Sequence, residues 1–260
     1  MMKIETFLPA VSLRPFIKGY RLVECEEERI NKILPDTALS LAFRIRGEFG
    51  SVHDNYLAQL PATTFSGIQK SVRFIHYQKN TTAIIVLFKE TGAAAFFKEP
   101  LDEYFELSLS MENFDSAGRL STLQDQLWHA HNNAQAVRLI EQYLIERLQG
   151  YQVDKLIYNA IERINAAGGR LNIRELSNEL YISQDAFEKR FRKLAGTTPK
   201  QFSSIVRIKA VIKQYVEPVS FYDLALDNGY YDQPHFNRDF KLFTGQTPRD
   251  FFRNKSTAYW

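Results

Sequence analysis

The feature that most constrains this chain of 260 residues is an internal repeat near its C-terminal end. The segment 187–202 realigns with the segment 236–251 when it is shifted by 49 positions. Both copies hold two phenylalanines four residues apart, then a glycine, a Thr-Pro pair and a final phenylalanine. Three further positions are basic in both copies. Agreement at this many positions indicates a duplicated structural unit.

Each copy of the repeat follows a short helical segment and a tight turn. The helical segments are 173–180 in the first unit and 221–228 in the second. Ser183 and Asp232, which end the two turns, are residues that favour helix N-caps. Pro234 suits the first turn of a helix, where its missing N–H has no intrahelical partner. A short helix, a turn and a second helix form a helix-turn-helix unit.

The second helix of each unit is predicted at about 184–195 and about 233–244. A spacing of i, i+4 and i+7 places apolar residues on one face of each helix, and we expect these residues in the core. They are Phe187, Phe191 and Leu194 in the first unit, and Phe236, Phe240 and Phe243 in the second. The polar residues Asp185, Glu188, Lys189 and Arg192 lie on the other side of the first helix, and Gln233, His235, Asn237, Arg238 and Lys241 are left for solvent on the second.

These polar faces have the composition of a surface that reads double-stranded DNA. A recognition helix reads bases with its N-terminal residues, and basic residues further along contact phosphates. Arg238 suits the bidentate pair with guanine, and Gln233 could pair with adenine. A charged, solvated face is also the ordinary fate of such residues, but a basic residue at the same place in both copies, Lys189 and Arg238, favours DNA binding. The alternative is a small-molecule-binding or adaptor protein whose helical module docks a protein partner, with little dependence on salt.

The stretch from Ile173 to Phe252 resembles the AraC/XylS-type DNA-binding domain. The resemblance implies seven helices, with two helix-turn-helix subdomains joined by a linker helix at 199–215. It also implies that the recognition helices enter successive major grooves, about 34 Å apart. The matching residues of the second unit are Asp223-Leu-Ala225, Gly229-Tyr230, Asp232, His235-Phe236, Arg238, Phe240-Lys241, Gly245 and Thr247-Pro248.

Carried over by position, the resemblance assigns roles to individual residues. Base contacts fall to Asp185, Glu188 and Lys189 in the first unit, and to Gln233, Pro234, His235 and Arg238 in the second. Phosphate contacts are expected for Ser183, Arg192, Lys193, Lys200, Asn237, Lys241 and Arg249. The first unit departs from the pattern at Tyr181, where glycine is common, and at Ser177, where alanine is usual. Acidic side chains accept from cytosine and otherwise repel phosphate, which sets Asp185 and Glu188 apart.

The N-terminal half has a β-rich pattern, with strands expected at 38–43, 71–77 and 82–88 and short helical turns at 92–97 and 101–107. From 116 the period changes to that of helices, at 116–130 and 134–148. A short connection makes these an antiparallel hairpin at 116–149. The hairpin packs on its own domain or serves as a homodimer surface. The predicted fold class is therefore α+β: a β-rich domain with a helical hairpin at 1–150, then an all-helical domain at 151–260.

The N-terminal half also resembles, more loosely, the small β domains that precede this helical module in one group of these regulators. The resemblance implies effector sensing or oligomerisation, and names no ligand. It also makes RNA polymerase an expected partner, and activation is the commoner mode of regulation in families of this kind. The residues that carry it are Ile33-Leu-Pro-Asp36, then Phe88-Lys-Glu-Thr-Gly92-Ala, and Phe96-Phe97.

The charge distribution and the motifs indicate which functions the chain can have. Residues 1–150 carry 16 Lys+Arg against 18 Asp+Glu, and residues 151–260 carry 17 against 12, which is a mild indication of an anionic partner on the C-terminal side. No nucleotide-binding, nucleophile-elbow or zinc-protease motif occurs. The histidines have no recognised metal-ligand spacing, and Cys25 is flanked by carboxylates that disfavour its thiolate. We therefore expect no enzyme activity, no cofactor and no metal.

Apolar runs are too short for a membrane span. The longest run is 83–88, whereas a spanning helix needs about 20 residues. The start, MMKIETFLPA, has no apolar run of the signal-peptide kind. The sequence therefore predicts a cytoplasmic protein with no membrane partner.

Overall fold

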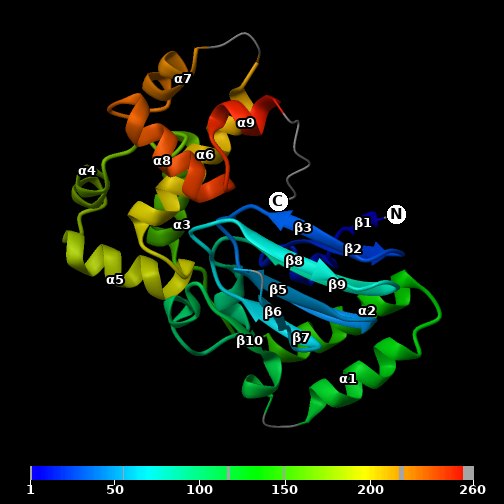
Figure 1. The fold of residues 1–260 in the computed structure, drawn as a ribbon. Helices are drawn as coiled ribbons and strands as arrows, with labels where there is room; N and C mark the ends of the chain where they lie inside the picture. The colour runs from blue at the N-terminus through cyan, green and yellow to red at the C-terminus, as the bar shows by residue number, and fades with distance from the viewer. Residues whose placement is uncertain (1, 55, 116–117, 149, 217–219, 254–260) are drawn as a thin grey trace. The chain divides into compact units, whose positions relative to one another are not determined.

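The computed structural model in Figure 1 describes residues 2–54, 56–115, 118–148, 150–216 and 220–253. The chain divides into two compact units. The first comprises Met1–Asn31, Ala38–Gly67 and Phe74–Gln152, and the second comprises Lys32–Thr37, Ile68–Arg73 and Val153–Trp260. The predicted fold class is confirmed, because a β-rich region with a helical hairpin precedes an all-helical region.

The β-rich region holds two sheets, and the pairs with an assigned register run antiparallel. The six-stranded sheet has the order β1-β2-β9-β4-β7-β10, and the four-stranded sheet has the order β3-β8-β5-β6. The strands are β1 (Met2–Phe7), β2 (Ile17–Cys25), β3 (Arg29–Ile33), β4 (Ser40–Arg46), β5 (Phe49–His53), β6 (Tyr56–Gln59), β7 (Thr63–Ser66), β8 (Arg73–Tyr77), β9 (Thr81–Phe88) and β10 (Ser108–Ser110).

The strands expected from apolar runs are present as β4, β8 and β9, with shifted ends. The strands that were not anticipated mix charged and polar residues into short alternating segments. In β2, for example, Lys18 is exposed and Glu24 half-buried, while Tyr20 and Leu22 are buried. Two expected helical turns are 3-10 turns, at Gly92–Ala95 and Leu101–Tyr104, and two more occur at Val11–Leu13 and Met111–Phe114.

The helical hairpin consists of α1 (Arg119–Trp128) and α2 (Asn133–Arg147). Its expected start at 116 lies outside the described residues. The apolar stripes of both helices are buried within the first unit, for example at Leu123 and Ile140. The Tyr143 ring of α2 meets the Phe43 ring of β4 edge-on, with 6.2 Å between ring centroids. The stripes are therefore used in packing the hairpin on its own sheet.

The described part of the second unit contains seven α-helices, as the family resemblance implied. The linker helix α6 separates the pair α4–α5 from the pair α7–α8 (Figure 1). The predicted recognition helices coincide with α5 and α8. The helices are α3 (Lys155–Ala166), α4 (Ile173–Glu179), α5 (Gln184–Ala195), α6 (Pro199–Gln214), α7 (Phe221–Asp227), α8 (Gln233–Thr244) and α9 (Pro248–Arg253).

The repeated residues have the same structural role in both copies. Phe187 and Phe191 of α5 are fully buried, and so are Phe236 and Phe240 of α8. In each pair the two rings meet at a steep angle, with centroids 5.7 Å and 5.5 Å apart. Leu194, which was expected in the core with the first pair, is only partly buried. The two phenylalanine pairs therefore fix which face of each recognition helix points inward.

The remaining repeat positions end one helix and begin the next. Gly196 and Gly245 close α5 and α8 in the left-handed conformation, at φ values of 78° and 74°. The Thr198 hydroxyl accepts a hydrogen bond from the backbone N–H of Gln201, at 3.0 Å, and so caps α6. Thr247 makes the equivalent contact in front of α9. The Gly–x–Thr–Pro element is therefore a duplicated corner between helices.

The two helix-turn-helix turns differ in length and in the residue that adopts a positive φ. Tyr181 and Gly229 hold equivalent places, since each donates its N–H to a carbonyl three residues back and has positive φ, 54° and 75°. Four residues, 180–183, separate α4 from α5, whereas five residues, 228–232, separate α7 from α8. A left-handed conformation costs a non-glycine residue roughly 1–2 kcal/mol. The first turn therefore carries a strain at Tyr181 that the second avoids.

Candidate nucleic-acid interface

The outward face of α5 carries the residues expected to contact DNA in the first unit. Asp185, Lys189 and Arg192 are exposed on the side opposite the buried phenylalanines. Glu188 is half-buried, and its carboxylate accepts a hydrogen bond from the Gln184 side chain at 2.9 Å. This face therefore offers acidic residues near the helix start and basic residues further along.

The outward face of α8 is more basic. Pro234, Arg238 and Lys241 are exposed at i, i+4 and i+7, on the face that points away from the core. Gln233 and Asn237 are half-buried. Arg238 is thus the exposed guanidinium nearest the start of α8, in the region from which a recognition helix reads bases.

His235 is exposed but is held by its neighbours. Its Nε2 lies 3.5 Å from the Asp239 carboxylate, one helical turn away. Its ring meets Tyr230 edge-on, with 5.4 Å between centroids. Its backbone N–H donates to the Asp232 carboxylate at 2.7 Å, which caps α8. The imidazole is therefore pre-positioned beside a carboxylate that also disfavours a nearby phosphate.

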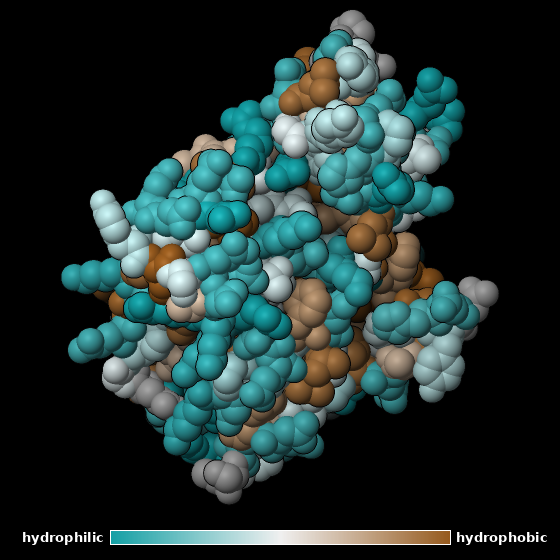
Figure 2. Space-filling model, turned by 90° about the vertical axis from the view of Figure 1, so that its left-hand side faces the viewer, coloured by the Kyte–Doolittle hydropathy of each residue, from teal (hydrophilic) through white to brown (hydrophobic). Residues whose placement is uncertain are grey.

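The other predicted phosphate-binding residues lie at the ends of helices. Ser183 caps α5 by accepting from the backbone N–H of Ala186 at 3.4 Å. Lys193 is exposed on the last turn of α5. Lys200 and Arg249 are exposed just after the prolines that open α6 and α9. The side of the molecule on which α4 and α5 lie is predominantly hydrophilic, with separate apolar side chains (Figure 2).

Two arginines connect the helix-turn-helix subdomains, and sequence reasoning missed both. The Arg207 guanidinium on α6 donates to the carbonyl of Gly169 at 2.8 Å and lies 5.3 Å from the centre of the Tyr230 ring. Arg170 donates to the carbonyl of Asp227, at the end of α7, at 2.9 Å. These contacts join residues far apart in sequence, so no local pattern predicts them. They fix the position of one subdomain on the other.

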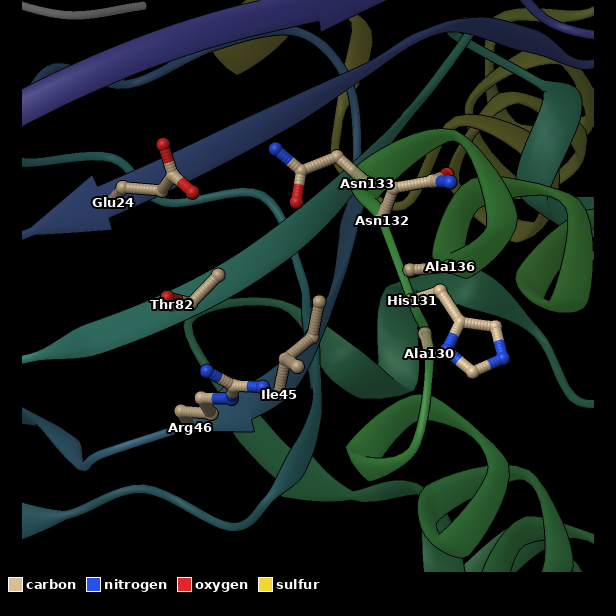
Figure 3. Close-up of a pocket in the computed structure, with 9 residues that line it drawn as sticks. All are labelled: Glu24, Ile45, Arg46, Thr82, Ala130, His131, Asn132, Asn133 and Ala136. Carbon is tan, nitrogen blue, oxygen red and sulfur yellow. The ribbon is translucent and has the colours of Figure 1, made fainter.

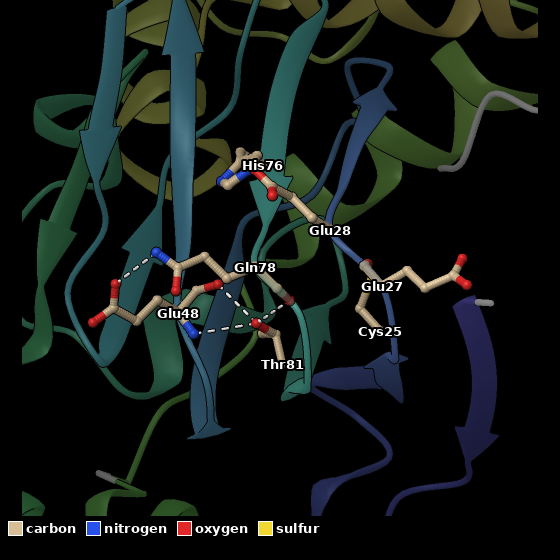
Figure 4. Close-up of polar contacts among 7 residues, drawn as sticks. All are labelled: Cys25, Glu27, Glu28, Glu48, His76, Gln78 and Thr81. Carbon is tan, nitrogen blue, oxygen red and sulfur yellow. Dashed lines mark hydrogen bonds and ion pairs between the residues drawn. The ribbon is translucent and has the colours of Figure 1, made fainter.

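Groups considered for chemistry serve structural roles in the β-rich unit (Figure 4). The Cys25 thiol is buried and donates to the carbonyl of Glu27 at 3.0 Å. Burial raises the pKa of Cys25, so the predicted direction holds, but the main cause is desolvation rather than the flanking carboxylates. His76 pairs with Glu28 at 2.7 Å. Among the described residues, no group of three or more His, Cys, Asp or Glu side chains is arranged to hold a metal ion.

Comparison with known proteins assigns both regions. Residues 176–254 match a family described as a helix-turn-helix domain, and residues 5–110 match a domain of unknown function, DUF6597. The helix-turn-helix match covers both duplicated units, together with the linker helix between them. The C-terminal part of the chain is therefore a helix-turn-helix DNA-binding domain of the AraC type, and the chain is a DNA-binding transcription regulator. Because this family is not enzymatic, the expectation that the chain is no enzyme is confirmed.

Several solved structures are similar to this chain. ToxT from Vibrio cholerae O395 is 12% identical, covers 92% of this chain and 98% of its own, and has a TM-score of 0.45. A transcriptional regulator with an AraC-type DNA-binding domain from Chromobacterium violaceum is 19% identical and has a TM-score of 0.36. Its match covers 39% of this chain and 93% of its own length. The C-terminal domain of AraT from Geobacillus stearothermophilus is 15% identical and has a TM-score of 0.38. Its match covers 42% of this chain and 93% of its own length. No curated protein matches the chain.

No helix in the described part of this regulator has the length and apolar character needed to cross a membrane.

The first prediction concerns the arginine link between the subdomains. We expect Arg207→Ala to lower the free energy of unfolding by about 1–2 kcal/mol, because it removes hydrogen bonds to a carbonyl and a cation–π contact. Denaturant unfolding of the full chain measures the change. Lys213→Ala, an exposed position on the same helix, serves as the control and should change it by less than about 0.5 kcal/mol. Equal effects for the two variants would contradict the assigned role.

Proposed function

We propose that this regulator places α5 and α8 in successive major grooves on one side of a duplex. The supporting observation is the duplication itself: each helix buries a phenylalanine pair and leaves the opposite, polar face exposed. Both helices carry a basic residue at the same place on that face, Lys189 and Arg238. Two such faces in one chain suit two neighbouring turns of one duplex.

The residues divide into groups that select sequence and groups that hold the backbone. Arg238 is the strongest candidate for base reading, because it is exposed and can pair with guanine through two hydrogen bonds. Lys189 has the matching role in α5. The other proposed base contacts are Asp185, Glu188, Gln233, Pro234 and His235. The proposed phosphate contacts are Ser183, Arg192, Lys193, Lys200, Asn237, Lys241 and Arg249.

A footprint on DNA selected with the full chain tests this geometry. A random duplex library enriched by binding gives the operator sequence, and chemical footprinting on it gives the contacted bases. We expect two contacted segments centred about 10–10.5 base pairs apart on the same side of the duplex. A single short footprint, or binding that barely responds to salt, would favour the protein-docking alternative.

The second prediction separates base reading from backbone binding. Arg238→Ala should weaken operator binding by about 1–3 kcal/mol and relax selectivity at one base pair. Lys241→Ala should weaken binding to all sequences alike and reduce the slope of affinity against salt by about one. Titrations of both variants on operator and scrambled duplexes, at several salt concentrations, measure this. Arg138→Ala, an exposed arginine of α2, is the control. Identical behaviour of the two variants would contradict the division.

We propose that the regulatory input acts on residues 1–150 and that the DNA-binding part is 151–260. The β-rich unit holds a pocket of about 180 Å³ between the sheet and the connection from α1 to α2 (Figure 3). Its lining includes Glu24, Arg46 and His131 and the asparagines that begin α2. ToxT is described with an unsaturated fatty acid bound. The charged lining and small volume here suit a small polar effector better than an acyl chain.

This regulator would act where promoters and RNA polymerase are found. A protein bound beside a promoter changes transcription by touching or obstructing RNA polymerase, so the polymerase is its second proposed partner. We place the protein in the cytoplasm and take activation as its proposed mode. Activation is the commoner mode of regulation in families of this kind.

We also propose that homodimers form through the hairpin, residues 116–149. The apolar stripes of the hairpin are buried in the unit, so a dimer would use its outer surface. A groove of about 230 Å³ runs between α1 and α2 on that surface. It is lined by Arg119, Thr122, Leu123, Gln126, Leu139, Gln142, Tyr143 and Glu146.

The third prediction tests this groove. Gln142→Arg places an added charge in the lining at an exposed position, so it should convert the dimer to a monomer without unfolding the hairpin. Sedimentation velocity on the full chain, over a range of concentrations, measures the oligomeric state. Arg138→Glu, on the same helix but outside the groove lining, should leave the dimer intact. A monomeric wild-type chain at high concentration would end the proposal.

A further inference from the structure

Tyr181 is the most exposed large side chain of the regulator that lies beside a recognition helix. Its side chain is 97% exposed, and among the described residues it has no side-chain hydrogen bond, ring contact or ion pair. A tyrosine usually gains stability by burying its ring and giving its hydroxyl a partner. Tyr181 does neither with any residue that the structure describes.

The backbone at Tyr181 makes this exposure costly. Its φ of 54° is in the left-handed region, which glycine adopts without strain. The equivalent place in the second turn is Gly229, with the same hydrogen bond to a carbonyl three residues back. The first turn therefore has a strained tyrosine at the position where the second turn has Gly229, which adopts the same conformation without strain. Nothing that the described part of the chain offers to its side chain offsets the strain.

Tyr181 lies in the turn that leads into the proposed DNA-reading end of α5. It lies two residues before Ser183, the N-cap of α5, and therefore at the end of the helix whose first residues read bases. The phosphate backbone lines the major groove on both sides, so a side chain projecting from this turn meets sugar and phosphate rather than base edges. A phenol suits such a contact, because its ring packs on the sugar and its hydroxyl donates to a phosphate oxygen.

We propose that Tyr181 is a DNA-contacting residue whose hydroxyl donates to a backbone phosphate beside the first recognition helix. This inference rests on the proposed docking of α5 in a major groove. The contact is neutral and carries no sequence information. It therefore strengthens binding to every duplex and does not change counterion release.

The experiment compares Tyr181→Gly and Tyr181→Phe in the full chain. Tyr181→Gly should raise the melting temperature by a few degrees, because it relieves the left-handed strain, and yet weaken DNA binding about three- to tenfold. Tyr181→Phe keeps the ring and the strain, so it should leave the melting temperature unchanged and weaken DNA binding by less than Tyr181→Gly, because only the hydrogen bond to phosphate is lost. Both losses should be equal on operator and scrambled duplexes, with an unchanged slope of affinity against salt. Tyr56→Phe, at an exposed tyrosine of β6, is the matched control.

Each other outcome overturns the inference. Wild-type affinity in Tyr181→Gly would show that the side chain does not meet DNA. A loss in Tyr181→Gly without a loss in Tyr181→Phe would assign the effect to the ring and remove the phosphate hydrogen bond. A loss confined to the operator would indicate base reading instead. Lys241→Ala tests the proposed function separately. If this variant binds DNA more weakly while both Tyr181 variants bind normally, only the Tyr181 inference fails. If the wild-type chain binds no duplex, both proposals fail.

Discussion

The burial of one phenylalanine pair on each recognition helix is the constraint from which the DNA-binding half follows. Two rings spaced four residues apart can be buried together only if the helix turns one particular face inward. The opposite face is then exposed whatever its residues are, and here those residues are polar, with basic side chains on both helices. The glycine and the Thr-Pro pair that follow set where each helix ends and where the next begins. A short apolar pattern thus determines the orientation of a polar surface.

Orientation of single helices is not sufficient, because two helices must also be held at a fixed spacing. The linker helix supplies the distance, and two arginines add direct contacts across it. Arg207 binds the first subdomain through a carbonyl and the second through the face of Tyr230, while Arg170 reaches the end of α7. Hydrogen bonds to backbone carbonyls constrain direction more strongly than apolar contacts do. The two arginines therefore add directed contacts between the subdomains beyond the linker helix itself.

The helical half could be predicted from the sequence far better than the β-rich half. Helix signals such as the cap at Ser183, the proline at 199 and the buried spacing of Phe187 and Phe191 are local, and the duplication repeats them. Strand β2 gave no comparable signal, because its pairing with β9 joins residues some sixty positions apart and polar residues such as Lys18 and Glu24 interrupt its apolar pattern. Arg170 and Arg207 could not be predicted either, because their partners also lie far away in the sequence. Their importance comes from residues that only the fold brings near.

The candidate site was predicted as a set of residues, but not as a ranking. The sequence assigned base contacts to both His235 and Arg238, and only the fold shows the carboxylate that lies beside His235. It treated Glu188 and Asp185 alike as well, although only Glu188 is engaged by a neighbouring side chain, Gln184. Such differences depend on rotamers and on partners one turn away. They change which side chains are ready to meet a base.

The unequal turns have a consequence for the kind of DNA site this chain can use. A dimer with two-fold symmetry presents the same surface twice in opposite directions, and its targets are palindromes. Here the two surfaces follow one another in a single chain, and a five-residue turn in one against a four-residue turn in the other makes them different. A target that fits both has a left end and a right end. In the proposed docking a single bound molecule therefore has a direction along the DNA, and reversing the site exchanges the segments that α5 and α8 would meet.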